Sequence, residues 1–332
     1  GHIERPNDAS EQFFNFLDKS KSQIFKVGLD VYLDDKNTVS FFTNYNPAAN
    51  KNDGLSEAIF KNDPSLNQIQ KVFADGENNS HQYNFNYKHN LAKEGSTIEF
   101  EADHNIYDAN NPTTFSYPRA VEDAYKDTNN TDRKRSTLNV DYVNPLTENS
   151  KLELGLEARL FNSIIQFSST GESINSEGLL VPAPDTTFDY TRDIYSAYVT
   201  YGNSFDKCTY QAGLRFEQVE VAALALEDVD KSNFSNLYSE LYPSFFVTYS
   251  PTEKNTYQIS YSRRIDRPGI GQVNPIKEWS TPLVSSYGNK ELSITLSDTA
   301  ELNVVSTCRP ETLPRHNPTV RMCLIFDQAF RI

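Results

Sequence analysis

The chain has 332 residues, with 31 lysines and arginines against 45 aspartates and glutamates and a formal net charge of −14. This acidic balance argues against a nucleic-acid partner, which would require a basic surface. Aromatic residues reach 12%, too many for a disordered acidic chain, and no run of about 18 apolar residues predicts a transmembrane helix.

Alternation of apolar and polar residues predicts β-strands along most of the chain, because successive side chains of a strand point to opposite faces. In chain order the alternating runs cover 27–33, 83–87, 98–102, 152–160, 195–201, 210–216 and 257–261. Several runs extend over about ten residues, the length of a transmembrane β-strand. The segment 55–73 favours a short helix inside a loop. We count about eleven strands in all.

Short and long connections alternate between these runs. The short, polar turn sequences cover 33–37, 91–96, 144–150, 201–207 and 250–255. The long polar stretches, which we expect to be loops, cover 46–80, 108–131, 168–187, 222–237 and 267–291. Short turns at one end and long loops at the other are typical of outer-membrane barrels.

The predicted fold is therefore all-β: a partial antiparallel transmembrane β-barrel with short periplasmic turns and long extracellular loops. The polar face of the strands should line a wet lumen, and the residues expected to face it are Glu153, Glu157, Arg159, Arg215 and Glu217. A soluble antiparallel sheet with one solvated face would give the same alternation. An odd strand number, a single methionine at Met322 and an N-terminus without an apolar signal core all favour one part of a larger barrel.

The stretch YSRRIDRPGIGQVNP, residues 261–275, breaks a strand-like run with Arg-Pro-Gly. Arg263 and Arg264 should point to opposite faces of the strand, one toward lumen carboxylates and the other toward the membrane interface. Pro268 cannot donate to a strand ladder, so regular pairing should end near it. The motif is thus interpreted as a strand exit that turns the chain back into the barrel mouth, rather than as a direct ligand site.

This stretch, together with YGNKEL at 287–292, resembles a hallmark of the Bacteroidetes-type outer-membrane β-barrel family, which is related to TonB-dependent receptors. The matching positions are Tyr261, Ser262, Arg263, Arg264, Ile265, Arg267, Pro268, Gln272, Asn274, Pro275, Gly288, Asn289 and Leu292. The likeness covers most of 20–305. The family continues with a proline and an acidic residue, where this chain has Ser293 and Ile294.

The resemblance divides the chain into an N-terminal lead-in (1–19), a barrel segment (20–305) and an irregular tail (306–332), which we interpret as aberrant. It implies a receptor in the outer membrane of a Gram-negative bacterium, surrounded by outer-membrane lipid. Such a receptor binds a nutrient, here unknown, and takes it up with an energy-coupling inner-membrane complex. No catalytic residues, metal site or cofactor are expected, and the protein should not be an enzyme. The alternative is a soluble or surface-attached β-rich binding or adhesion module.

Overall fold

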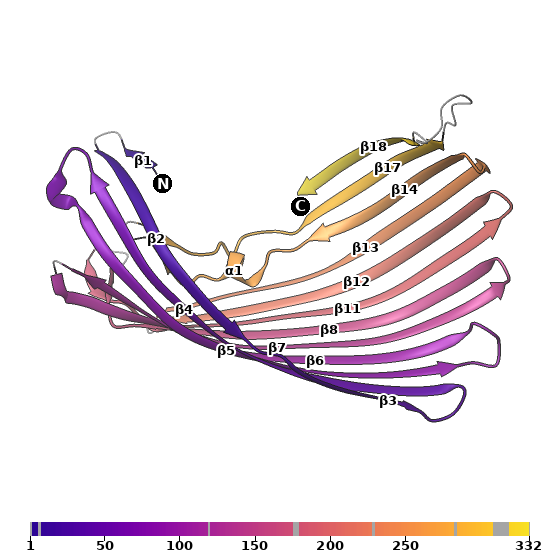
Figure 1. Cartoon of the computed structure of the whole chain (residues 1–332), viewed down its shortest axis with the longest axis horizontal. Helices are drawn as coiled ribbons and strands as arrows, with labels where there is room; N and C mark the ends of the chain where they lie inside the picture. Colours follow the sequence, from indigo (N-terminus) through magenta and orange to yellow (C-terminus); the bar gives the residue numbers. More distant parts are fainter. Residues whose placement is uncertain are drawn as a thin grey trace, which may run out of the picture.

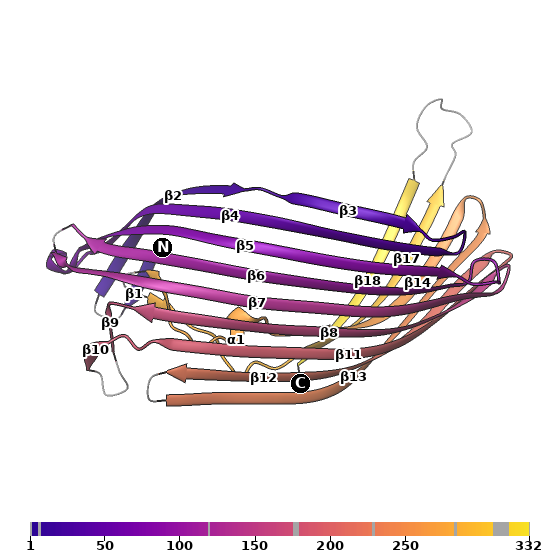
Figure 2. The same cartoon turned by 90° about the horizontal axis from the view of Figure 1, so that it is seen from below.

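One antiparallel sheet of 14 strands makes up most of the chain (Figure 1). The computed structural model describes residues 2–5, 8–118, 120–174, 179–227, 230–281, 284–307 and 319–331. The sheet curves strongly in both views, so it has a concave and a convex face (Figures 1 and 2). Its outer strands, β1 and β18, pair only with β2 and β17, so the described sheet forms an arc of barrel wall that is not closed.

The strands run as an antiparallel meander in which neighbours along the chain pair, except that β2 and β3 lie end to end beside β4. The main sheet contains β1 His2–Arg5, β2 Asp8–Ser22, β3 Phe25–Tyr32, β4 Asn37–Phe60, β5 Gln68–Asn90, β6 Thr97–Tyr117, β7 Ala120–Thr147, β8 Ser150–Ser169, β11 Thr186–Phe205, β12 Cys208–Glu227, β13 Asp230–Thr252, β14 Asn255–Asp266, β17 Thr295–Thr307 and β18 Thr319–Arg331. Two small hairpins add β9 Glu172–Ile174 with β10 Leu180–Pro182, and β15 Glu278–Thr281 with β16 Val284–Ser286. The helical turns are η1 Pro64–Leu66 and α1 Ile270–Val273, and no helix of the described residues is long and apolar enough to cross a membrane.

Three of the five stretches expected to be long loops are largely strand: 46–80, 108–131 and 222–237. The strands are accordingly longer than expected, reaching 28 residues in β7. The helix favoured in 55–73 is only the single turn η1, and the main sheet has 14 strands rather than about eleven. Strand β2 begins inside the expected lead-in 1–19, and the tail expected to be irregular carries β18 paired with β17.

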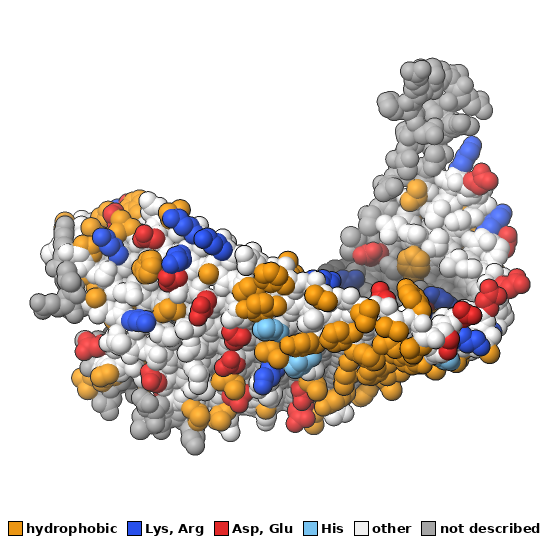
Figure 3. Space-filling model, turned by 60° about the horizontal axis from the view of Figure 1, so that its bottom comes forward, with side chains coloured by type: hydrophobic (Ala, Val, Ile, Leu, Met, Phe, Trp, Pro, Cys, Tyr) orange, Lys and Arg blue, Asp and Glu red, His pale blue; other side chains and the backbone are white. Residues whose placement is uncertain are grey.

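The convex face is apolar in the half of the sheet next to the short turns, here called the turn end. One row of cross-strand partners on this face runs Val140–Leu156–Ala197–Phe216–Leu241. Its large side chains are all exposed, Leu156 to 61%. Figure 3 shows the hydrophobic side chains gathered along the convex face toward this end. An exposed apolar band on the outside of a curved wall is what a hydrocarbon environment requires.

The two faces exchange character toward the opposite end, here called the loop end. There the convex face of β11 and β12 carries Asp189, Asp193 and Glu220, while the concave face buries Phe188 and Tyr190. Because the faces exchange character, the stretches 46–80, 108–131 and 222–237 have a polar composition, and this composition led to the expectation of loops. A single alternating pattern therefore describes only half of each strand.

The segment 267–294, here called the inward segment, follows β14, and its described residues, 267–281 and 284–294, lie over the concave face (Figure 1). Its Val273 and Ile276 are buried in a cluster with wall residues, among them Phe188, Tyr190 and Ala223. It corresponds to the predicted strand exit. Burial of these apolar side chains fixes the segment against the wall, because each contributes roughly 1.5–3 kcal/mol when fully removed from water.

Candidate functional site

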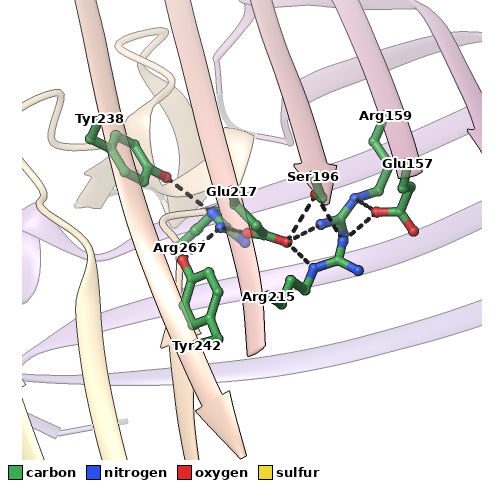
Figure 4. Close-up of polar contacts among 8 residues, drawn as sticks. All are labelled: Glu157, Arg159, Ser196, Arg215, Glu217, Tyr238, Tyr242 and Arg267. Atoms are coloured by element: carbon green, nitrogen blue, oxygen red, sulfur yellow. Dashed lines mark hydrogen bonds and ion pairs between the residues drawn. The ribbon is translucent and has the colours of Figure 1, made fainter. Parts of the chain in front are cut away.

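A cluster of buried and half-buried charges lies on the concave wall, centred on Glu217 of β12 (Figure 4). Glu217 Oε1 is 2.8 Å from Arg159 Nη2 and 2.8 Å from Arg215 Nε. Glu157 Oε1 lies 2.7 Å from Arg159 Nε and 2.6 Å from Arg215 Nη2. Two carboxylates and two guanidinium groups thus form a closed four-membered network, to which the hydroxyl of Ser196 is hydrogen-bonded.

The register of three strands brings this network together. Ser196 of β11 is the cross-strand partner of both Glu157 on β8 and Glu217 on β12, so the three side chains form one row. Strands β8 and β12 are both antiparallel to β11 and therefore run parallel to each other. Arg159 follows Glu157 by two residues and Arg215 precedes Glu217 by two, so the two arginines lie one step away on opposite sides of that row. All of these residues share the concave face because cross-strand partners point to the same side of a sheet.

Arg267 completes the network from the inward segment. Its Nη2 is hydrogen-bonded to Glu217 Oε2, and its Nε donates to the Tyr238 hydroxyl at 3.0 Å. The Tyr242 hydroxyl lies on its other side (Figure 4). Burial alone would lower the pKa of Arg267, but the hydrogen bond to Tyr238 and the charge of Glu217 raise it above its ordinary value. The guanidinium therefore stays charged and connects the inward segment to the wall.

The second half of the motif holds the inward segment in shape. Gly288 N donates to Asn274 O at 2.6 Å, and Asn289 N donates to Gln272 O at 2.7 Å. A Cβ on Gly288 would lie 2.6 Å from the backbone of Gln272 and Asn274, so only glycine allows this approach. The side chain of Gln272 also accepts from Gly269 N at 2.8 Å. Three parts of the motif that are separate in sequence therefore meet in one backbone arrangement.

Two other polar side chains of the motif region shape the loop locally. The Asn274 side chain accepts from Ile276 N at 3.1 Å, across Pro275, and is itself buried. Pro268 follows Arg267 directly, and strand pairing ends at Asp266, two residues before this proline. These residues order the inward segment.

The paired arginines lie where β14 ends and have separate surroundings. Arg263 shares the convex face with Tyr261, and both bind Asp298 of β17, with Arg263 Nε and Nη2 at 2.8 and 2.9 Å from its two carboxylate oxygens. Arg264, the next residue of the strand, is exposed on the concave side. Of these three arginines, Arg267 is the one that binds a carboxylate on the concave, lumen-side face.

One expected lumen residue lies apart from the network. Glu153 is on the concave face of β8 nearer the turn end, and its carboxylate pairs with Lys151 Nζ at 2.6 Å. The residues that sequence reasoning missed are Ser196, Tyr238, Tyr242 and Asp298. Ser196 lies in an alternating run and Tyr242 lies outside the runs identified from the sequence; neither carries a charge to single it out, and their contacts depend on register.

A row of amide and carboxylate groups continues the polar concave face toward β5 and β6. Asn84 Nδ2 donates to Glu101 Oε1 at 2.9 Å, and Asn86 Nδ2 donates to Glu99 Oε1 at 2.6 Å. Among the residues that the structure describes, no three His, Cys, Asp or Glu side chains gather as a metal site. Because of Glu99 and Glu101, the concave face at the turn end is polar and largely acidic away from the Arg159–Arg215 pair.

A strongly curved antiparallel wall, apolar outside and charged inside, defines a large β-barrel of the outer-membrane class. A comparison with family profiles supports this class: the profile of the outer membrane protein beta-barrel family matches residues 89–309. The chain belongs to this family, and it is a protein of the outer membrane of a Gram-negative bacterium.

A solved structure shows the same fold at low sequence identity. The ferric-catecholate import receptor Fiu of E. coli K12 is 8% identical with a TM-score of 0.55, and the match covers 95% of this chain and 57% of that receptor. The ferric yersiniabactin uptake receptor FyuA of Yersinia pestis is 9% identical with a TM-score of 0.48, and the match covers 98% and 55% of the two chains. This chain thus spans little more than half the length of these receptors. No curated protein matches its sequence.

Proposed function

We propose that this chain is part of the barrel of a substrate-importing outer-membrane receptor similar to TonB-dependent receptors. Residues 20–305 supply barrel wall together with the inward segment. The receptor binds a nutrient on its outer side and moves it inward, driven by an energy-coupling complex of the inner membrane. It performs no covalent chemistry on the nutrient. The candidate classes for this nutrient are metal chelates, oligosaccharides and peptides.

The observation that carries the proposal is the ordered concave face. Burying charges costs several kcal/mol per ion, and a buried Arg–Glu network is seldom kept for stability alone. Here the network joins three wall strands to the inward segment through Arg267. The network thereby orders the inward segment inside the wall, where it can present side chains to a substrate.

Uptake measurements on the full-length protein in its own host test the proposal. Strains with and without the gene would be compared for uptake of a labelled ferric chelate, an oligosaccharide and a peptide. Loss of uptake of one class on deletion, restored by the intact gene and abolished by a protonophore, is expected. Unchanged uptake of all three classes would refute the importer function. Release of the protein from membranes without detergent would instead favour the soluble β-rich binding module.

A further inference from the structure

A cavity lies between the inward segment and the wall, on the loop-end side of the Glu217 network. It measures about 240 Å³ and is lined by three aromatic side chains, Tyr190, Phe234 and Tyr238, and by Arg192, Lys290 and Glu291. Pockets for whole drug-sized ligands measure about 300–1,000 Å³. This cavity therefore fits one substituent of a ligand, about the size of a single ring.

Arg192 is the group in this cavity whose charge is not balanced by the wall. It is half-buried on the concave face of β11, between its cross-strand partners Phe161 and Val221. Its guanidinium lies 5.7 Å from the centre of the Phe161 ring. The neighbouring acidic residues of its own strand, Asp189 and Asp193, lie on the opposite face. Among the described residues no carboxylate lies within ion-pairing distance of Arg192, whereas Arg267, which also lines the cavity, is paired with Glu217.

Lys290 brings a second cation from the opposite side of the cavity. It belongs to the inward segment, and its Nζ is 3.0 Å from the hydroxyl of Ser232. Glu291 is exposed and offsets one of the two positive charges. The remaining balance is positive, in a chain whose net charge is −14 and whose concave face is acidic toward β5 and β6.

We infer that this cavity is a binding site for an anionic substituent carried on a ring, such as an aromatic carboxylate. Arg192 supplies two parallel donors that match a carboxylate, Lys290 supplies a point charge, and the aromatic side chains pack against the ring. Wall and inward segment each contribute a cation, so the ligand contacts both. The inference specifies a ligand class for the proposed receptor and rests on that function only for its physiological meaning.

A charge series of one ring scaffold tests the site directly. Benzoate, benzamide and benzylamine would be titrated into the full-length protein in detergent, with binding followed by ligand-observed NMR. Benzoate is expected to bind at least about tenfold more tightly than benzamide, because hydrogen bonds to charged groups are the stronger ones. Benzylamine is expected not to bind. Equal binding of all three compounds would overturn the inference.

Variants locate the binding within the cavity. Arg192→Gln should reduce benzoate affinity about tenfold, Arg192→Lys should retain part of it, and Glu291→Gln should increase it. Lys290→Gln removes a positive charge from the cavity. Its matched control is Lys134→Gln, which removes a positive charge from the convex face, where the cross-strand partner of Lys134, Asn162, also lies. An unchanged affinity in Arg192→Gln would overturn the inference even if benzoate binds.

The two proposals fail separately. Uptake that depends on the gene, combined with no preference for benzoate over benzamide, would refute the anion site and leave the importer intact. A benzoate preference that Arg192→Gln abolishes, combined with no gene-dependent uptake, would support the site and refute the importer.

Discussion

Gly288→Ala offers a sharp test of how the inward segment is held. The added Cβ would lie 2.6 Å from backbone atoms of Gln272 and Asn274, which cannot move aside as a flexible side chain would. The matched control is Gly271→Ala in α1, where a Cβ meets nothing within 4 Å. Neither glycine has a positive φ, so the two substitutions differ in space and not in backbone strain.

The expected size of the effect follows from the contacts that are lost. Overpacking costs about 1–3 kcal/mol, and each of the two backbone hydrogen bonds beside Gly288 contributes about 0.5–1.5 kcal/mol. A total near 3 kcal/mol would raise the open population of the inward segment roughly a hundredfold, since about 1.4 kcal/mol is a factor of ten.

Hydrogen exchange measured by mass spectrometry on the full-length protein in detergent would report this opening. In Gly288→Ala, peptides from the inward segment should exchange roughly a hundredfold faster, while peptides from β8, β11 and β12 keep their protection. Gly271→Ala should exchange as the parent protein does. Equal exchange in the two variants would refute the close approach of Gly288 to the 272–274 backbone.

Three further predictions concern the wall. Glu217→Gln should lower the free energy of unfolding in urea, measured in lipid vesicles, by about 3–5 kcal/mol, because it leaves three arginines around an uncharged group. The control Glu240→Gln, which lies one strand further along the same row and is half-exposed, should cost much less. Equal losses in the two variants would contradict the network. Leu156→Arg should lower the free energy of unfolding by about 2–4 kcal/mol in the same assay. The control Gln166→Arg, on the same face of β8 about 33 Å further along, should be nearly neutral. Similar losses in the two variants would show that the apolar band is misplaced. Arg263→Gln breaks a half-exposed ion pair on the convex face and should leave urea stability and assembly into the outer membrane almost unchanged; failed assembly would reveal a larger role for that pair.

Sequence alternation was sufficient to identify the strands next to the turns and the all-β class, whereas the outer-membrane fold was indicated by the connection pattern and by the motif of residues 261–292. It also placed Glu157, Arg159, Arg215 and Glu217 on one face, because a two-residue spacing puts side chains on the same side of a strand. That they contact one another depends on the register of β8, β11 and β12, which no local pattern specifies. The contribution of Arg267 depends on how a 28-residue connection folds back. Composition alone could not distinguish Arg267 from the nearby Arg263 and Arg264 as the arginine that joins the network.

The loop-end halves of the strands were missed for a physical reason. Around Pro47 small and polar residues replace the large apolar ones, and toward the loop end of both β4 and β12 the buried positions, among them Ala58 and Ala223, lie on the concave face. Such stretches have the composition of loops, and only the continuous pairing of their backbones with neighbouring strands reveals them as sheet.

The exchange of polar and apolar character along the wall has a consequence for the bilayer itself. On β11 the convex face changes from Val199 and Tyr195 to Asp193 and Asp189 within a few residues. A thicker bilayer would draw these carboxylates into hydrocarbon, whereas a thinner one would leave Val199 in water, and either hydrophobic mismatch costs fractions of a kcal/mol per Å. Summed over neighbouring strands, this mismatch energy favours a bilayer of one hydrocarbon thickness, and it fixes the depth and tilt of the wall in the membrane.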